Sequence, residues 1–458
     1  MVHQFKNNGY NIVMDVNSGA IHVVDELVYD IVDKYKELSG DEIAALLSDR
    51  YPDEDIREAY EEVCQLENEG RLFTKDVYMP RLKSFDNRPV VVKALCLHIA
   101  HDCNLACEYC FAGKGEYHGD REMMSAETGK KALDFLVENS GTRKHLEVDF
   151  FGGEPTMNMD VVKEVVAYGR QLEKTTDKVF RFTLTTNGLL LDDELLEYID
   201  REMSNVVLSI DGRKEVNDRM RPFRDKKRRD DPEASVYDMI LPKYKEVAER
   251  RGQERYYVRG TFTRNNLDFA KDVLHLADQG FKQVSVEPVV APLTEDYAIR
   301  EEDIPFILDQ YDELAKEMAE RNKRGEGFNF FHFMIDLEGG PCVIKRLQGC
   351  GSGCEYLSVV PNGDLYPCHQ FAGNESMKMG DVDRGVTNTP LREEFHKSNV
   401  YTKPDCQDCF AKFYCSGGCA ANSYNFTGDI NGSYRIGCEM QKKRVECAIM
   451  LKAAEAEK

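Results

Sequence analysis

The sequence has no long hydrophobic run and too few basic residues to balance its acidic ones. No apolar stretch in the 458 residues reaches the length of a membrane span, so no membrane segment is expected. Residues 1–16 lack a basic start followed by a long apolar core, so no signal peptide is expected. Lys and Arg number 60 against 82 Asp and Glu, and the net charge of −22 repels a nucleic-acid backbone or an anionic membrane. The sequence therefore predicts a cytoplasmic protein that binds neither.

Cysteine, by contrast, is plentiful. There are 15 cysteines in a chain without an export signal, which favours metal ligands over a disulfide framework. The length suggests about three domains with a sizeable core. Together these features indicate an oxygen-sensitive cytoplasmic metalloenzyme.

The most informative motif is a cysteine triplet that follows the apolar run 91–100. Cys103, Cys107 and Cys110 have the spacing C-x3-C-x2-C. Three thiolates on one loop can hold three irons of a [4Fe–4S] cluster and leave the fourth iron open. A zinc knuckle is the alternative, but three cysteines without a nearby histidine make a poor closed zinc site. The motif resembles that of the radical S-adenosylmethionine (SAM) superfamily, in which the open iron chelates the amino and carboxylate groups of SAM.

Between residues 90 and 300, strand and helix patterns alternate. The expected strands are 91–99, 146–151, 180–185, 206–210, 257–263 and 283–287. Six such repeats predict an α/β fold with a parallel sheet and outer helices. The resemblance implies a partial (β/α)6 TIM barrel of the radical SAM type, with functional groups at the carboxyl ends of its strands. The charged run 221–231 (RPFRDKKRRDD) is expected to be a solvated surface segment.

Polar or glycine-rich motifs end several of these strands. GGEP follows the second strand, TTNG ends the third and SIDG the fourth, and an arginine lies within the fifth. Each motif singly is also an ordinary turn or helix cap. By the resemblance they bind SAM: glycine carbonyls its ammonium group, small polar side chains its ribose and methionine part, and the arginine its carboxylate. An arginine inside a strand is expected to need such an anion. The candidate SAM-binding residues are Tyr109, Gly152, Gly153, Glu154, Thr186, Asn187, Ser209, Asp211 and Arg259.

Residues 1–80 form a separate candidate unit. Two apolar-rich runs, 10–16 and 20–24, flank a turn at 17–19, and three helical patterns follow at 25–36, 41–49 and 53–70. This outline is typical of a winged helix-turn-helix. The unit is acidic and lacks a basic recognition helix, which argues against DNA binding, so strand addition by a peptide is expected. It resembles the leader-peptide recognition elements of enzymes that modify ribosomally made peptides.

A connecting helical segment is expected at 301–338. Residues 339–458 are rich in glycine and cysteine, and a region with so few large apolar residues needs its cysteines to stabilise a defined fold. The pattern C-x2-C-x5-C-x3-C from 406 to 419 resembles the SPASM extension of radical SAM enzymes. The resemblance implies a distal auxiliary [4Fe–4S] cluster on Cys406, Cys409, Cys415 and Cys438, and a nearer one on Cys350, Cys354, Cys368 and Cys419. A zinc ribbon is the alternative. The upstream spacing departs from the commonest pattern, so Cys342 could replace Cys350 or Cys354, and the nearer cluster could have three protein ligands.

The whole chain resembles the thioether-forming maturases of SCIFF peptides, which are short and cysteine-rich. The resemblance implies three [4Fe–4S] clusters, SAM, a precursor peptide bound through its leader, and a flavodoxin- or ferredoxin-type electron donor. The expected reaction joins a cysteine sulfur to the α-carbon of a threonine. One alternative is a sulfatase-type maturase, although such enzymes have an aspartate where this chain has His369, which could itself be a base. Another is a non-catalytic iron–sulfur carrier or peptide-binding protein, against which GGEP, SIDG and Arg259 argue.

Overall fold

The computed structural model describes residues 1–82, 87–117, 119, 121–337 and 343–456. Its centre is a single sheet with the order β10-β9-β8-β7-β6-β5-β4-β11-β12-β13-β14. The six parallel core strands are β4 (Ala94–Ala100), β5 (His145–Gly152), β6 (Val179–Thr186), β7 (Met203–Ser209), β8 (Tyr256–Phe262) and β9 (Gln283–Pro288). All six strands expected from the sequence are therefore confirmed to within a few residues.

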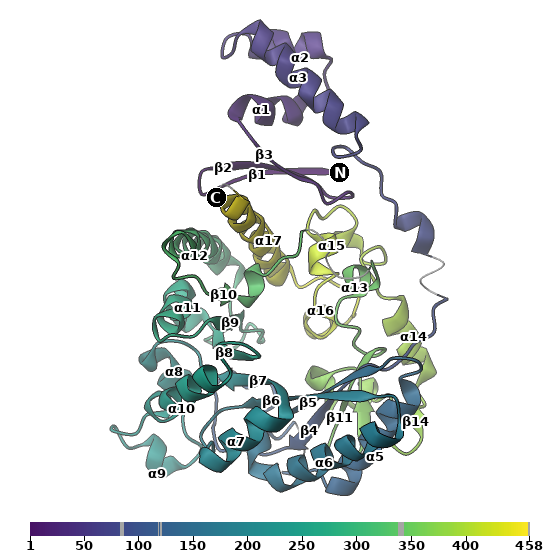
Figure 1. Ribbon diagram of the computed structural model, residues 1–458, viewed down its shortest axis with the longest axis vertical. Helices are drawn as coiled ribbons and strands as arrows, with labels where there is room; N and C mark the ends of the chain where they lie inside the picture. Colours follow the sequence, from purple (N-terminus) through teal and green to yellow (C-terminus); the bar gives the residue numbers. More distant parts are fainter. Residues whose placement is uncertain (83–86, 118, 120, 338–342, 457–458) are drawn as a thin grey trace.

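Helices cover the outer side of this sheet (Figure 1). The principal ones are α5 (Ala126–Asn139), α6 (Met159–Thr175), α7 (Asp193–Glu202), α10 (Val236–Arg250), α11 (Phe269–Asp278) and α12 (Ile304–Arg324), with the shorter α8 (Lys214–Met220) and α9 (Lys226–Arg229) between β7 and β8. Their apolar faces and the alternate residues of the strands form the main core, for example Leu133, Phe150 and Phe182. Within the described residues no helix is both long and apolar enough to cross a bilayer.

The C-terminal region extends the same sheet, which the sequence did not predict. β11 (Tyr356–Val359) pairs parallel to β4, and β12 (Asp364–Tyr366), β13 (Gly380–Asp381) and β14 (Gly385–Val386) continue outward antiparallel. At the other edge β10 (Asn329–Phe330) pairs with β9. The remaining helices are α13 (Val343–Gln348), α14 (Thr389–Lys397), α15 (Lys412–Cys415), α16 (Ala420–Thr427) and α17 (Arg435–Ala456). Strand pairing therefore joins this region directly to the core.

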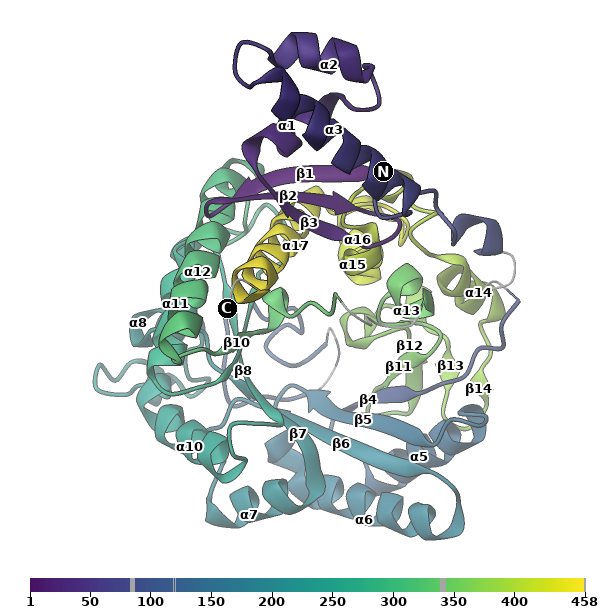
Figure 2. The same ribbon diagram turned by 45° about the horizontal axis from the view of Figure 1, so that its top comes forward.

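The N-terminal unit is an antiparallel sheet, β1 (Val2–Asn7), β2 (Tyr10–Asp15) and β3 (Ile21–Val24), followed by α1 (Glu26–Lys34), α2 (Gly40–Leu47) and α3 (Asp53–Asn68). The expected hairpin and three helices are present, and β1 is an additional strand. Along β2, Val13 packs against the three helices, whereas Ile12 and Met14 belong to the main core. The sheet thus lies between its own helices and α17, with which β1 and β2 are in contact (Figure 2).

Candidate functional site

The loop after β4 brings the three core cysteines to one small cavity of about 120 Å³. Cys103, Cys107 and Cys110 line it, and none is in a disulfide. Burial raises the pKa of Cys107 to about 11, and it raises that of Cys103 further, with a contribution from neighbouring thiols. Thiolates so disfavoured need a nearby positive charge, which bound iron would supply.

The glycines of GGEP allow the backbone after β5 to approach the cysteine loop. Gly152 has a φ of +123°, and a Cβ on Gly153 would lie 2.0 Å from the carbonyl oxygen of Asp102. The Gly153 N–H donates to the carbonyl of Ala100 at 2.7 Å, and the Glu154 N–H donates to that of Asp102 at 2.8 Å. No side chain fits at Gly153 without displacing the loop that carries the cysteines.

Glu154 ties the same corner to the end of β6. Its buried carboxylate accepts hydrogen bonds from the Thr186 hydroxyl and the Asn187 N–H, both at 2.7 Å, and from the N–H and hydroxyl of Thr156. The Asn187 amide in turn donates to Asn104 at 2.7 Å and lies 3.7 Å from Cys103 Sγ. The structure thus brings GGEP and TTNG to the cysteine loop, and Glu154 holds them together through its side chain.

The carboxylate of Asp211 fixes the side chain of Tyr109 through hydrogen bonds. Asp211 is fully buried, and the Tyr109 hydroxyl donates to its carboxylate at 2.8 Å, while the Thr261 N–H donates at 3.0 Å. Burial raises the pKa of Asp211 to about 6, against the opposing effect of Arg221. Of the SIDG residues, Ser209 lines the cavities described here, whereas Asp211 does not.

The expectation of a wholly solvated segment at 221–231 is wrong for its first four residues. Arg221 is 8% exposed and donates to the Tyr109 hydroxyl at 2.8 Å. Arg224 donates to the carbonyls of Cys103 and Lys114 at 3.3 and 3.0 Å. These two guanidinium groups therefore hold Tyr109 and the cysteine loop in place. Only the remainder, which contains α9, is exposed.

Arg259 also differs from expectation, because it is not a buried charge. Its side chain is 51% exposed, and its Nε lies 3.6 Å from Glu287 Oε1. Buried and more exposed residues alternate along β8, and Arg259 is the most exposed of them. Its side chain therefore lines a large cavity at the strand ends instead of packing into the core. No anion is needed to offset its burial.

The SPASM-like cysteines fall into two neighbouring groups. The pKa of Cys415 is raised to about 12, mainly by burial and to a smaller extent by the neighbouring Cys438, Cys406 and Cys409. The pKa of Cys368 is raised above its usual range, mainly by burial and to a smaller extent by Cys419 and Cys350. For Cys354, burial raises the pKa to about 11, and the charged groups that contribute to the shift are Arg392, Arg88 and Glu355. Cys342 lies outside the described residues.

Lys403 lies among these cysteines. It is 4% exposed, and its ammonium donates to the carbonyls of Gly417 at 2.8 Å and Ile430 at 3.0 Å. Burial lowers the pKa of Lys403, and the thiols of both groups oppose this shift. A buried cation is therefore built into the auxiliary cysteine region, and no local sequence pattern predicts it.

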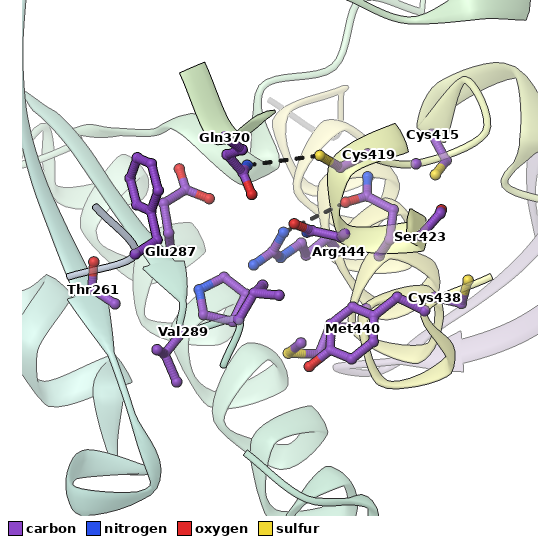
Figure 3. A pocket seen from close by; sticks show the side chains of 18 of the residues that line it. Thr261, Glu287, Val289, Gln370, Cys415, Cys419, Ser423, Cys438, Met440 and Arg444 are labelled. Atoms are coloured by element: carbon purple, nitrogen blue, oxygen red, sulfur yellow. Dashed lines mark hydrogen bonds between the residues drawn. The ribbon is translucent and has the colours of Figure 1, made fainter. Parts of the chain in front are cut away.

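One cavity of about 940 Å³ joins the two halves of the site (Figure 3). Its core wall includes Cys107, Cys110, Ser209 and Arg259, and its opposite wall comes from the C-terminal region. His369 lies in its lining and contacts the Tyr356 hydroxyl at 3.3 Å. The auxiliary cysteines that line this cavity are Cys406, Cys409, Cys415, Cys419 and Cys438.

The donor chemistry fits iron–sulfur clusters better than single ions. Among the described residues no three His, Cys, Asp or Glu side chains are close enough together to ligate one metal ion. The ligand candidates are thiols throughout, which is the donor set that iron–sulfur clusters use.

Comparisons with known proteins agree with this geometry. Residues 97–236 match the family model described as the Radical SAM superfamily. The chain is 29% identical over 136 residues to an uncharacterized protein of Methanocaldococcus jannaschii, a match that covers 30% of this chain and 44% of that protein. It is 22% identical over 361 residues to a cysteine-type anaerobic sulfatase-maturating enzyme of Clostridium novyi, covering 75% and 92%.

Two solved structures share the fold over most of the chain. Native anSMEcpe with bound AdoMet and the Cp18Cys peptide gives a TM-score of 0.63 at 19% identity, covering 80% of this chain and 99% of that one. Streptococcus suis SuiB bound to precursor peptide SuiA gives 0.52 at 16% identity, covering 93% and 97%. The chain therefore has the α/β radical SAM fold with its parallel sheet.

Proposed function

We propose that this protein is a radical SAM enzyme that joins a cysteine sulfur to the α-carbon of a threonine in a ribosomally made, cysteine-rich peptide. The observation that carries the proposal is the cavity of about 940 Å³ with Cys107 and Cys110 at one wall and five auxiliary cysteines at the other. A cavity of this size is at the upper end of the usual range for small-ligand sites, so it has room for a peptide segment beside SAM.

The cofactors follow from the thiol groups. A [4Fe–4S] cluster on Cys103, Cys107 and Cys110 would supply the electron that cleaves SAM to methionine and a 5′-deoxyadenosyl radical, and clusters on the auxiliary cysteines would accept the surplus electron. The chain's own residues position the reactants. The backbone at Gly152 and Gly153 and the side chain of Ser209 border the space for SAM. Asp211 and Arg221 orient Tyr109 against it.

The bond changes balance. The α-carbon loses one hydrogen atom to the deoxyadenosyl radical, the cysteine thiol loses one proton, and the new carbon–sulfur bond releases one electron, which replaces the one used to cleave SAM. The peptide therefore loses two hydrogens and keeps its sulfur. A flavodoxin- or ferredoxin-type protein is the proposed source of the first electron.

We assign Cys350, Cys368 and Cys419 to the nearer auxiliary cluster. Cys419 and Cys350 contribute to the raised pKa of Cys368, and Cys350 contributes to that of Cys419. No thiol contributes to the pKa shift of Cys354. Three protein ligands would leave one position for the thiol of the peptide. A metal-bound thiol loses its proton readily, and its sulfur would be held beside the α-carbon.

The leader of the peptide is proposed to add to β3. In the order β1-β2-β3, β1 and β3 are the edges, and β1 faces the C-terminal region: His3 stacks on Phe410 with ring centroids 3.5 Å apart and lies 2.9 Å from Glu446. β3 remains available for strand pairing, and Val23 on it is 50% exposed.

A sulfatase-type maturase is the second candidate, favoured by the similarity to the sulfatase-maturating enzyme of Clostridium novyi. The residue after Cys368 discriminates the two, since an aspartate base is expected there in such enzymes and this chain has His369 in the cavity wall.

The test is an anaerobic reaction of the reconstituted protein with SAM, dithionite and a cysteine-rich peptide encoded beside its gene. We expect methionine and 5′-deoxyadenosine, and a peptide lighter by two hydrogens whose fragmentation shows a cysteine–threonine link. Oxidation of one side chain without a crosslink would favour the sulfatase-type reaction. A protein that binds the peptide but releases no deoxyadenosine would be a carrier or binding protein. The variant with Cys103, Cys107 and Cys110 changed to Ala is the negative control.

A further inference from the structure

Arg444 of α17 lies in the wall of the large cavity, and one of its guanidinium nitrogens, Nη2, is buried without a hydrogen-bond partner among the described residues. The residue is 7% exposed, its Nε donates to the Tyr311 hydroxyl at 2.8 Å, and its guanidinium carbon lies 5.2 Å from the centroid of that ring. Nη1 has one long contact, 3.5 Å to Gln441 Oε1, and Nη2 has no hydrogen-bond partner among the described residues. The guanidinium is thus held in place by one edge while its end is unsatisfied. A buried donor without a partner is costly, so a ligand that supplies an acceptor is favoured there.

The facing wall carries a carboxylate that already has partners. Glu287, at the end of β9, lies 3.6 Å from Arg259 and 2.9 Å from His332 Nε2. Burial lowers the pKa of His332, which favours its neutral form. Arg259 is the candidate partner of the SAM carboxylate, so Arg444 is the second guanidinium group near Glu287. Figure 3 shows Arg444 extending from α17 into the cavity toward the side of Glu287.

A role as counter-charge to the clusters fits other residues better. Lys403 interacts electrostatically with thiols of both auxiliary groups, and Lys442 interacts in the same way with Cys409 and Cys438. The electrostatic partners of Arg444 are instead Glu287, His332 and Tyr311. Its side chain extends into the space between the two walls (Figure 3), and Nη2 has no hydrogen-bond partner among the described residues.

We propose that Arg444 is a specificity-determining residue that binds the carboxylate of an acidic residue, Asp or Glu, in the peptide substrate. This rests on the proposed function in one respect, namely that the cavity receives a peptide. The end of a guanidinium, with Nη1 and Nη2, matches the two oxygens of a carboxylate, and the bidentate pair is charge-assisted.

The position of α17 supports a peptide route past Arg444. The same helix contacts the N-terminal sheet through Glu446 and Cys447, which lie near His3 and Asn7. Its N-terminal turns, with Cys438, Met440 and Arg444, line the cavity. A peptide held at its leader by the N-terminal sheet would cross α17 to reach the thiols, and its acidic residue would meet Arg444 on the way in.

The test uses the full-length, cluster-reconstituted protein and a pool of randomised peptides with one fixed cysteine, selected for retention without reductant. The wild type should enrich Asp and Glu at one set distance from the cysteine, about tenfold over Asn and Gln, a factor that corresponds to about 1.4 kcal/mol. Arg444→Gln should abolish the enrichment, and Arg444→Lys, which keeps the charge without the fork, should retain part of it. Arg435→Gln is the matched control, because Arg435 also lines the cavity from α17 but its side chain is 77% exposed.

Absence of acidic enrichment in the wild type, or undiminished enrichment in Arg444→Gln, would overturn the proposal. Thermal unfolding of each variant shows whether it is folded, and Arg444→Lys keeps the test decisive if Arg444→Gln is not. The selection needs no electron and no turnover. Acidic enrichment in a protein that releases no deoxyadenosine would therefore refute the proposed reaction and leave the carboxylate site standing.

Discussion

Replacing Gly153 by Ala tests whether backbone contact between GGEP and the cysteine loop holds the core cluster. The new Cβ would lie 2.0 Å from the Asp102 carbonyl oxygen, and since real Cβ atoms keep at least 3.0 Å, the two segments must separate by about 1 Å. That movement breaks the hydrogen bonds from the Gly153 and Glu154 N–H groups to the carbonyls of Ala100 and Asp102. Each group left without a partner costs about 1–3 kcal/mol, so we expect a loss of roughly 2–6 kcal/mol at this corner.

The loss should appear first in cluster loading. Iron in Gly153→Ala should fall from about twelve to about eight atoms per chain, as expected if three clusters hold four irons each and the core one is lost. Deoxyadenosine formation under dithionite should fall with it. Gly119→Ala is the control, because a Cβ there meets no described residue nearer than 3.8 Å. A Gly153→Ala protein with full iron content, unchanged Tm and unchanged SAM cleavage would show that the reasoning is wrong.

Three further predictions concern the other parts of the chain. Cys354→Ala should retain its iron, whereas Cys350→Ala should lose up to about four atoms, and the reverse ranking in iron analysis would contradict the assignment of the nearer cluster. Lys403→Met removes a buried positive charge and should lower the reduction potential of the auxiliary clusters in an EPR-monitored titration, while Lys403→Arg should not; equal potentials would argue against an electrostatic role. Deleting residues 1–80 should weaken peptide binding but spare uncoupled SAM cleavage, and it should lower Tm because Ile12 packs in the main core. Unchanged peptide affinity would refute the recognition role.

Local sequence signals predicted much of the fold. The six core strands are short β-branched and aromatic runs that end in glycine or polar motifs, so both their positions and the site at their carboxyl ends could be inferred. β1 was missed although Asn8-Gly9 is a hairpin signal. Both residues have positive φ, +47° and +90°, as a two-residue turn between β1 and β2 requires.

Features that depend on long-range pairing could not be inferred in the same way. β11 pairs with β4 across more than 250 positions of sequence, and neither strand encodes that register. Arg221 and Arg224 look like their exposed neighbours in a basic run, and only the tertiary structure shows that they hold Tyr109 and the cysteine loop. Arg259 was expected to be buried because strand position alone does not reveal where the sheet opens into a cavity.

The fusion of the C-terminal region to the sheet has a consequence for the chemistry. The register Tyr356↔Ala94 to Val359↔Leu97 continues the core sheet into β11, which leads through β12 to Cys368, while β4 leads to Cys103. On the opposite side of the cavity, α17 packs against α12 and carries Cys438. The core and auxiliary thiols are thus attached to one continuous framework at both sides of the space between them. The proposed reaction needs its reactants held within contact distance, and a fixed separation between the core thiols and the auxiliary thiols would meet this need without a moving domain. Peptide movement, rather than domain closure, would then bring each cysteine and its partner carbon into position.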